Sequence, residues 1–217
     1  MKNDCETTGQ VMSGANANGH SVRSYLELHG KVLGELPYLE IERIGHELSR
    51  AYEEERRVYL FGNGGSASLA SHLACDLGKG TVVCEGMRKR FQVMSLTDNT
   101  AVLTAWANDA SYEQVFAEQL RNLVHSGDIA FAISGSGNSP NVLLALQVAR
   151  ELGALNIGLS GFQGGEMKAL CDLCVIVPSD NMQIIEDLHV GIAHALFTII
   201  YHRISSSTSE LTRAAGR

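Results

Sequence analysis

The chain has 217 residues and a formal net charge of −7, because 24 Asp and Glu outnumber 17 Lys and Arg. This acidic balance argues against a nucleic-acid partner and against an anionic membrane surface, since both select for basic proteins. The length and a hydrophobic content of 45% are those of one globular domain. We therefore expect a single domain over residues 21–204, between two polar, mobile tails at residues 1–20 and 205–217.

Two features of the sequence bear on where the protein works. Residues 1–19 are polar and lack the apolar run of a signal peptide. We expect no apolar stretch in the rest of the sequence to be long enough to span a bilayer. The sequence therefore predicts a cytoplasmic protein.

Hydrophobic spacing divides the chain into alternating helices and strands. Apolar residues at helical spacing from Ser21 to about Arg56 predict two helices, which Pro37 separates. Short apolar runs predict five strands, at 58–61, 91–96, 129–133, 155–159 and 173–177. Further helices are predicted at 66–77, from about Asn99, and at 112–124, 140–152, 165–170 and 183–204. This alternation predicts an α/β fold with a doubly wound parallel sheet flanked by helices.

Two loops rich in glycine and serine each follow a predicted strand and precede a helix. Their sequences are Gly62-Asn63-Gly64-Gly65-Ser66 and Ser134-Gly135-Ser136-Gly137-Asn138-Ser139. Such loops suit a phosphate, because a helix N-terminus offers free N–H groups and serine hydroxyls add donors. In a parallel sheet both loops lie beyond the carboxyl ends of the strands, where ligands bind.

The loops lack the motifs of the common nucleotide binders. The first loop places Ala67 where a dinucleotide fingerprint has its third glycine, and it has no P-loop lysine. We therefore expect a compact phosphorylated sugar as ligand rather than NAD or ATP.

Two helices carry histidines and carboxylates at helical spacing. His72 and Asp76 are four residues apart on the helix after the first loop, and Glu186 and His194 are eight apart on the last helix. Each spacing brings the two side chains close to one helix face. Three interpretations are open: a zinc site, general acids and bases without a metal, or ordinary helix residues.

Cys171 and Cys174 form a Cys-x-x-Cys motif that leads into an apolar strand. The sequence has no second such pair to complete a structural zinc site. We interpret both cysteines as small hydrophobic packing residues.

Taken together, these segments resemble the sugar isomerase (SIS) domain, and within it the phosphoheptose isomerases. The resemblance runs from about residue 22 to residue 204. It rests on His72, Asn63-Gly-Gly-Ser66, Ser134-Gly-Ser-Gly-Asn-Ser139 and Ile185-Glu-Asp-Leu-His-Val-Gly-Ile-Ala-His194. That family converts sedoheptulose 7-phosphate to D-glycero-D-manno-heptose 7-phosphate, for bacterial surface glycans such as lipopolysaccharide. The resemblance implies a homotetramer with sites between subunits and a bound Zn²⁺.

The resemblance also implies a role for each site residue. The phosphate would be gripped by Ser134, Ser136 and Ser139. The sugar would be contacted by Asn63, Gly64, Gly65, Ser66, Asp98 and Glu186. The metal would be held by His72, Asp76, Glu186 and His194. Of these, Asp76 would be the base that takes a proton next to the carbonyl, and His194 its acid partner, through an enediol.

Several positions depart from the family pattern. Asp76 stands where the family usually has glutamate, and Glu186 where it has glutamine. Gly80 replaces an arginine, with Lys79 beside it, and Gly135 replaces a hydroxyl residue. Two alternatives therefore stay open: a SIS isomerase acting on another phosphosugar, and a non-catalytic SIS protein that binds the replication initiator DnaA. The two histidines and two carboxylates favour an enzyme.

Overall fold

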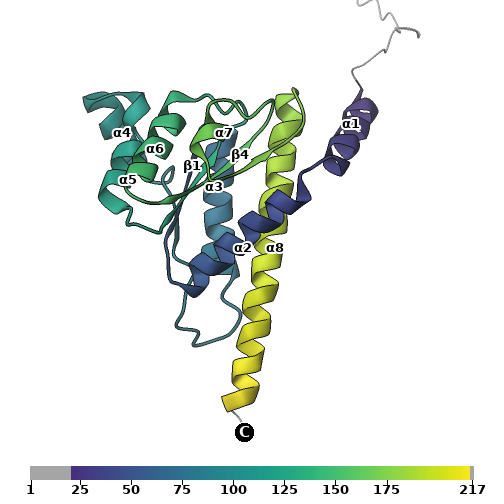
Figure 1. Cartoon of the computed structure of the whole chain (residues 1–217), viewed down its shortest axis with the longest axis vertical. Coiled ribbons are helices and arrows are strands. Elements are labelled where there is room, and N and C mark those ends of the chain that lie inside the picture. Colours follow the sequence, from purple (N-terminus) through teal and green to yellow (C-terminus); the bar gives the residue numbers. More distant parts are fainter. Residues whose placement is uncertain (1–20, 216–217) are drawn as a thin grey trace, which may run out of the picture.

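Five parallel strands form the centre of the fold, in the spatial order β2-β1-β3-β4-β5. The computed structural model describes residues 21–215 (Figure 1), so the tail predicted at residues 1–20 lies outside the described residues. The strands are β1 (Val58–Gly62), β2 (Val93–Ser95), β3 (Ile129–Ile133), β4 (Leu155–Ser160) and β5 (Leu173–Ile176). All residues of β1 and β3 are buried, as expected of apolar strands covered on both faces. The predicted parallel sheet is confirmed.

The strand order determines where a ligand can bind. β1 and β3 are neighbours, with Gly62 in register with Ile133. The chain crosses from β1 to β2 on one side, and then returns to β3 on the other side of β1. Such a reversal is the topological switch point at which open α/β sheets bind their ligands. Both glycine- and serine-rich loops begin at this point.

Two groups of helices cover the faces of the sheet (Figure 1). One group packs around a core that includes Ile44, Leu73 and Leu188, and consists of α2 (Tyr38–Glu53), α3 (Gly65–Cys75) and α8 (Met182–Ala215). The other packs around a core that includes Phe61, Phe116 and Leu146, and consists of α5 (Ala117–Leu123), α6 (Pro140–Glu151) and α7 (Met167–Leu170). A 3₁₀-helix at Tyr112–Gln114 contacts both α4 (Thr100–Asp109) and α6. Helices on both faces complete the doubly wound architecture.

The first helix, α1 (Val22–Gly34), projects from the body of the fold (Figure 1) and contacts α8. The Ser21 hydroxyl caps it by accepting the N–H of Ser24 at 3.1 Å. Pro37 precedes α2, which confirms the predicted break. Val22 and Leu26 on α1 are 79% and 59% exposed, so this helix carries apolar surface outward.

Helix α3 passes directly into a π-helix at Asp76–Gly80. The predicted helix at 66–77 is therefore confirmed and extended by a wider turn. π-helical turns are rare and frequently lie at functional sites. Here Asp76, one of the predicted site residues, begins the turn.

The end of α8 corrects the boundary that we predicted at residue 205. The helix continues to Ala215. Residues 205–215 contain neither glycine nor proline, so no residue there stops the helix. The Ser207 hydroxyl bonds the carbonyl of Arg203 at 3.0 Å, a partner that only a helical turn provides.

α8 also corrects the statement that no segment is long and apolar enough to cross a membrane. Met182–Ser207 meets both conditions, and 44% of its most apolar window is buried inside the fold. Ile184, Leu188 and Leu196 of this helix belong to the core that also holds α2 and α3. We therefore interpret α8 as the core helix of a globular domain.

Two predicted elements are shorter than expected. The helix at 112–124 is divided into the 3₁₀-helix Tyr112–Gln114 and α5, and the strand at 91–96 is reduced to Val93–Ser95. Cys171 and Cys174 are free thiols that pack, partly buried, against the core on the α6 side. This position agrees with their interpretation as packing residues.

Candidate active site

The first loop holds the end of β1 close to its neighbours. A Cβ atom at Gly62 would lie 2.5 Å from the Ile133 carbonyl oxygen and 2.8 Å from the Cβ of Ser66. Only glycine allows so close an approach of backbone to backbone. Ser66 is buried in the first turn of α3. The predicted loop residues therefore surround the N-terminus of α3.

The second loop presents serine hydroxyls that retain donor capacity. Gly137 has φ +65°, and a Cβ atom there would lie 2.1 Å from the Gly164 carbonyl oxygen, so only glycine fits. The Ser134 hydroxyl accepts the N–H of Gly137 at 3.2 Å, and the Ser136 hydroxyl accepts the N–H of Asn138 at 3.3 Å. A hydroxyl that accepts a bond can still donate its own O–H. These donors are what an incoming phosphate needs.

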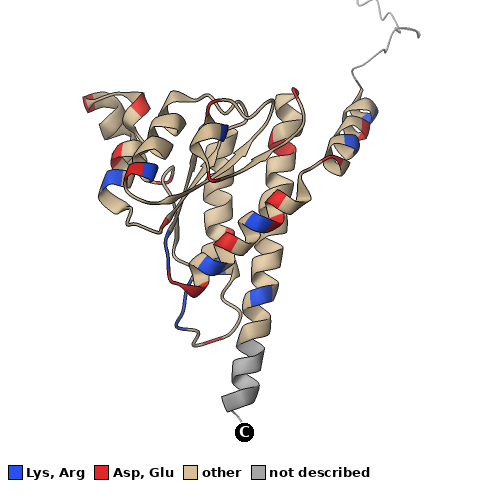
Figure 2. Cartoon of the chain, viewed as in Figure 1, with Lys and Arg blue, Asp and Glu red and all other residues tan. Residues whose placement is uncertain are grey.

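Ser139, the third predicted phosphate residue, closes the second loop. Its hydroxyl lies 3.4 Å from the Ser134 hydroxyl. Neither loop contains Lys or Arg, nor does α3, which is uncharged along its length in Figure 2. If these loops bind a phosphate, as predicted, the positive groups they offer are helix N-termini and hydroxyl protons rather than Lys or Arg side chains.

A pair of amides links the first loop to the helix that follows the second. Asn63 Nδ2 donates to Asn141 Oδ1 at 2.9 Å, and Asn141 Nδ2 donates back to Asn63 Oδ1 at 2.9 Å. The Tyr112 hydroxyl donates to Asn63 Oδ1 at 2.9 Å. The Asn63 amide oxygen thus has both lone pairs occupied, and one amide N–H remains for a ligand. Sequence reasoning missed Asn141 and Tyr112, although the place of Asn141 in the first turn of α6 is a signal that points to it.

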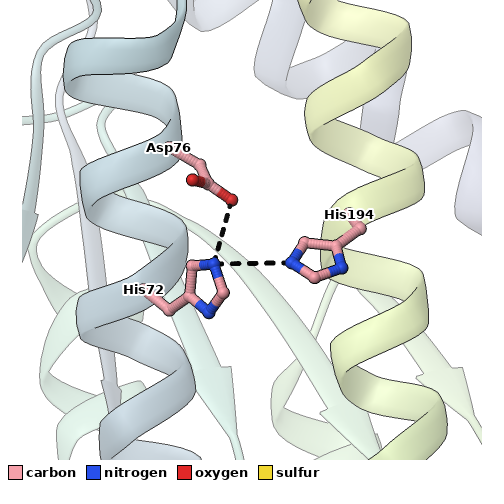
Figure 3. Close-up of side chains that lie close together, drawn as sticks. All are labelled: His72, Asp76 and His194. Atoms are coloured by element: carbon pink, nitrogen blue, oxygen red, sulfur yellow. Dashed lines mark hydrogen bonds and ion pairs between the residues drawn. The ribbon is translucent and has the colours of Figure 1, made fainter.

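His72, Asp76 and His194 meet in the space between α3 and α8 (Figure 3). His72 Nε2 lies 3.4 Å from Asp76 Oδ2 and 3.4 Å from His194 Nε2. The two imidazole rings are edge to face, with centroids 5.0 Å apart. His72 and His194 are exposed and Asp76 is half-buried, so a ligand can reach all three. The spacing of His72 and Asp76 along the sequence thus places both where α3 faces α8.

Two of the three separations among these donor atoms fit a tetrahedral metal ion, and all three atoms lie within 4.8 Å of one another. Two ligands at about 2.0–2.1 Å from such an ion are about 3.3–3.4 Å apart. The two separations around His72 Nε2 are both 3.4 Å. Two imidazoles and a carboxylate are also donors that Zn²⁺ takes at catalytic sites, where a fourth position stays open. The residues therefore fit the metal that the sequence resemblance implies.

Glu186, the fourth predicted ligand, lies outside this group. Its Oε2 atom lies 3.4 Å from where a Cβ of Gly65 would stand. Eight helical residues span about 12 Å, which places Glu186 about two turns from His194. Glu186 therefore stands beside the first loop, and its role as a metal ligand stays a prediction.

Asp98 follows β2 and lies beside α3. It accepts hydrogen bonds from the hydroxyls of Ser71 and Thr97. Together with Ser71 and Asn99 it lines an open depression of about 780 Å³. Sequence reasoning named Asp98 but missed its hydroxyl partners, and its contact with a sugar stays a prediction.

Two other ionisable residues of α8 have partners away from the donor group. His189 is buried, its Nε2 lies 3.1 Å from the Ser160 carbonyl oxygen, and burial lowers its pKa to about 4. Asp187 accepts the Tyr25 hydroxyl at 2.6 Å, and this hydrogen bond raises the pKa of Tyr25 to about 12. His189 is therefore a neutral residue of the interior, and Asp187 connects α8 to α1.

The packing explains two positions that depart from the family pattern. A Cβ atom at Gly80 would lie 2.8 Å from the ring of Phe197, so a side chain there requires the ring to move. A Cβ atom at Gly135 would lie 2.5 Å from the Sδ atom of Met182. The side chains of Phe197 and Met182 on α8 therefore occupy the space that a side chain at Gly80 or Gly135 would need.

The comparison with known sequences gives one consistent group of relatives. Residues 27–161 match the family model described as the SIS domain. The chain is 45% identical over 140 residues to the phosphoheptose isomerase of Paramagnetospirillum magneticum, covering 64% of this chain and 71% of that protein. It is 37% identical over 180 residues to the phosphoheptose isomerase of Clostridium acetobutylicum, covering 82% of this chain and 90% of that protein.

Solved structures give the same result for the fold. The phosphoheptose isomerase GmhA from Neisseria gonorrhoeae is similar with a TM-score of 0.76 at 27% identity, covering 82% of this chain and 96% of that one. A phosphoheptose isomerase from Francisella tularensis has a TM-score of 0.75 at 30% identity, covering 83% of this chain and 96% of that one.

Proposed function

The chain belongs to the SIS domain family, among the phosphoheptose isomerases, and on this premise we propose that it converts sedoheptulose 7-phosphate to D-glycero-D-manno-heptose 7-phosphate. The observation that carries the proposal is the convergence of His72, Asp76 and His194 on the helices that adjoin the first loop. An aldose–ketose isomerase needs a phosphate grip, a base and an acid. The phosphate-binding serines lie at the carboxyl ends of the strands. The base and the acid lie on the π-helical turn after α3 and on α8, which pack against the sheet.

The loops provide the grip on the phosphate. Ser134, Ser136 and Ser139 donate hydroxyl protons to its oxygens, and the N-terminus of α6 adds the positive end of its dipole. Asn63 directs its remaining amide N–H to a sugar oxygen, because its own oxygen is held by Asn141 and Tyr112. This arrangement fixes the substrate relative to α3.

Asp76 is the proposed base and His194 the proposed acid. Asp76 Oδ2 faces His72, so Oδ1 is the atom that takes the proton from the carbon next to the substrate carbonyl (Figure 3). His194 donates a proton to the carbonyl oxygen, which gives the enediol. Return of a proton to the former carbonyl carbon, with loss of the proton from the hydroxyl group on the adjacent carbon, converts the enediol to the aldose.

The same residues would hold a metal ion. His72, Asp76 and His194 would bind Zn²⁺, and we propose Glu186 as a fourth ligand or a substrate contact. When bound, the ion supplies a Lewis acid that stabilises negative charge on the substrate oxygen. Asp76 has two carboxylate oxygens and His194 two ring nitrogens, so each residue would hold the ion through one atom and transfer a proton through the other.

We further propose a cytoplasmic homotetramer that supplies the synthesis of bacterial surface glycans such as lipopolysaccharide. The exposed apolar residues Val22 and Leu26 on α1 support association between subunits. The net charge of −7 supports a small phosphorylated substrate rather than nucleic acid or an anionic membrane.

Asp76 gives a reason to test a second substrate class. It is one methylene shorter than the glutamate of the family pattern, and it begins a π-helical turn, a feature that is frequent at functional sites. A SIS isomerase for another phosphosugar is therefore the second candidate. The convergent donors argue against a non-catalytic protein that binds DnaA.

A substrate panel tests the proposal. The purified protein is incubated with sedoheptulose 7-phosphate, with a hexulose phosphate and with an amino-sugar phosphate, and products are identified by NMR. Bound metal is measured on the same sample, before and after treatment with a chelator. We expect heptose turnover that the chelator abolishes. Turnover of another phosphosugar alone would select the second candidate, and no turnover at all would refute an isomerase.

A further inference from the structure

A second concave site lies at the opposite end of the sheet from the glycine- and serine-rich loops. It is a pocket of about 360 Å³, formed by the end of α2, the segment 84–89 and the part of α8 near residue 204. α2 ends shortly before β1 begins, and the segment 84–89 shortly precedes β2, so the pocket lies at the amino ends of the strands. Arg203, which lines it, is nine residues beyond His194 on α8. The pocket is therefore separate from the proposed active site.

Three cationic side chains line this pocket: Arg88, Lys89 and Arg203. None of them forms an ion pair with any carboxylate in the part of the chain that the structure describes. Glu53 is the acidic residue among those that line the pocket, so the side chains there sum to 3 − 1 = +2. In a chain of net charge −7, this is a local reversal of sign.

Two of the cations are held in place by uncharged partners. Lys89 donates to the Glu53 carbonyl oxygen at 2.7 Å, and its Nζ lies 5.0 Å from the centre of the Tyr52 ring. Arg203 donates to the Ser49 hydroxyl at 3.1 Å. Neutral partners orient a charge without cancelling it, and a guanidinium has five donors, so donors are left over for a ligand.

We propose that this pocket binds a small phosphate ester, with the phosphate on Arg88, Lys89 and Arg203. A net charge of +2 matches a phosphate dianion, and a guanidinium fork matches the geometry of two phosphate oxygens. The less polar part of the ligand lies against Met87 and Ile204, which also line the pocket. The volume is within the range of small-molecule sites, about 300–1,000 Å³.

The test is a binding titration with inorganic pyrophosphate as the probe, by calorimetry at low ionic strength. The parent protein carries Ser134→Ala and Ser139→Ala, which remove hydroxyls from the phosphate loop and leave the pocket intact. We expect this parent to bind one pyrophosphate per chain. Adding Lys89→Gln and Arg203→Gln is expected to weaken binding at least tenfold, since a hydrogen bond to a charged group contributes more than about a factor of ten.

Because Arg203 also contacts α2, a second variant leaves it in place. Ser207→Asp sets a carboxylate at the rim of the pocket and is also expected to weaken binding about tenfold. Arg50→Gln is the matched control, since Arg50 is an exposed cation already paired with Glu47, and it should bind like the parent. The proposal is overturned if the parent binds no pyrophosphate, or if Ser207→Asp binds it as tightly as the parent. Neither result bears on isomerase turnover, which is measured separately.

Discussion

Helix α8 carries two histidines five residues apart whose surroundings are opposite. His189 is 1% exposed, its Nε2 lies against the Ser160 carbonyl, and its pKa is lowered to about 4. His194 is exposed and meets His72 across the space between α3 and α8. The first is fixed as a neutral group of the interior, and the second is available to a ligand. Residue type and helix are the same, so the face of the helix alone decides the role.

The largest effect is expected at the exposed member of the pair. His194→Ala should lower turnover of sedoheptulose 7-phosphate about 10²–10⁴-fold, the usual contribution of general acid–base catalysis. The unfolding midpoint should stay unchanged, because the side chain is exposed. His202→Ala, an exposed histidine on the same helix, is the matched control. Steady-state kinetics of both variants checks the prediction, and a loss of less than tenfold for His194→Ala would remove His194 from the mechanism.

The buried member should affect stability and its pH dependence instead. The folded state lowers the pKa of His189 from 6.5 to about 4, so the unfolded chain binds the proton more readily between these values. The contribution to stability is complete above pH 6.5 and is lost as the pH falls through about 4. A shift of this size corresponds to about 3 kcal/mol. Urea unfolding between pH 7 and pH 4 should show this extra loss in the wild type.

His189→Gln removes the titration while keeping an amide that can donate to Ser160. The variant should therefore lose less unfolding free energy than the wild type over the same pH range. Equal losses in the two proteins would mean that His189 contributes nothing to acid unfolding, and that carboxylates account for all of it.

A smaller effect on turnover is expected from Asn141. This buried residue holds the Asn63 amide in place by hydrogen bonds, as the Ser160 carbonyl holds His189. Asn141→Ala removes two of the three hydrogen bonds that orient the Asn63 amide. We expect about a tenfold lower kcat. Because Asn141 is buried and each lost bond contributes about 1 kcal/mol, the free energy of unfolding should also fall by about 2 kcal/mol. Asn122→Ala, on the exposed surface of α5, is the control. An unchanged kcat would show that Asn63 needs no such support.

The smallest effect is expected where α8 meets α1. Tyr25→Phe removes the 2.6 Å hydrogen bond to Asp187. Both partners are solvent-accessible, so the free energy of unfolding should fall by only about 0.5 kcal/mol. Denaturant unfolding measures this difference. A loss several times larger would mean that α1 is an integral part of the folded core.

The sequence allowed the local parts of the site to be predicted. Glycine and serine after an apolar run identify a loop at a strand end, and His72 with Asp76 follows from helical spacing, because both signals lie within a few residues. The strand order was not predictable, because it depends on contacts between segments far apart. The approach of His194 to His72 depends on the same kind of contact, although the family resemblance suggested it.

Three features of the structure were not predicted from the sequence, and the first of them depends on a contact between distant segments. Asn63 binds Asn141, which is 78 residues away, and no local pattern records that partnership. Glu186 was grouped with His194 because both lie near one stripe of α8, but the rise of the helix separates them by about two turns. The helical end of α8 was missed because a run of serines resembles a flexible tail, although the segment contains no glycine or proline to break the helix.

NMR of sedoheptulose 7-phosphate incubated with the protein in D₂O directly tests whether the chain isomerises this substrate through an enediol. If Asp76 removes and returns a proton through an enediol, that proton exchanges with solvent. The aldose phosphate should then appear with deuterium at the carbon next to its carbonyl. An unchanged ketose would contradict isomerase function. An aldose that keeps hydrogen at this carbon even after many forward and reverse turnovers would contradict proton transfer through an enediol at Asp76.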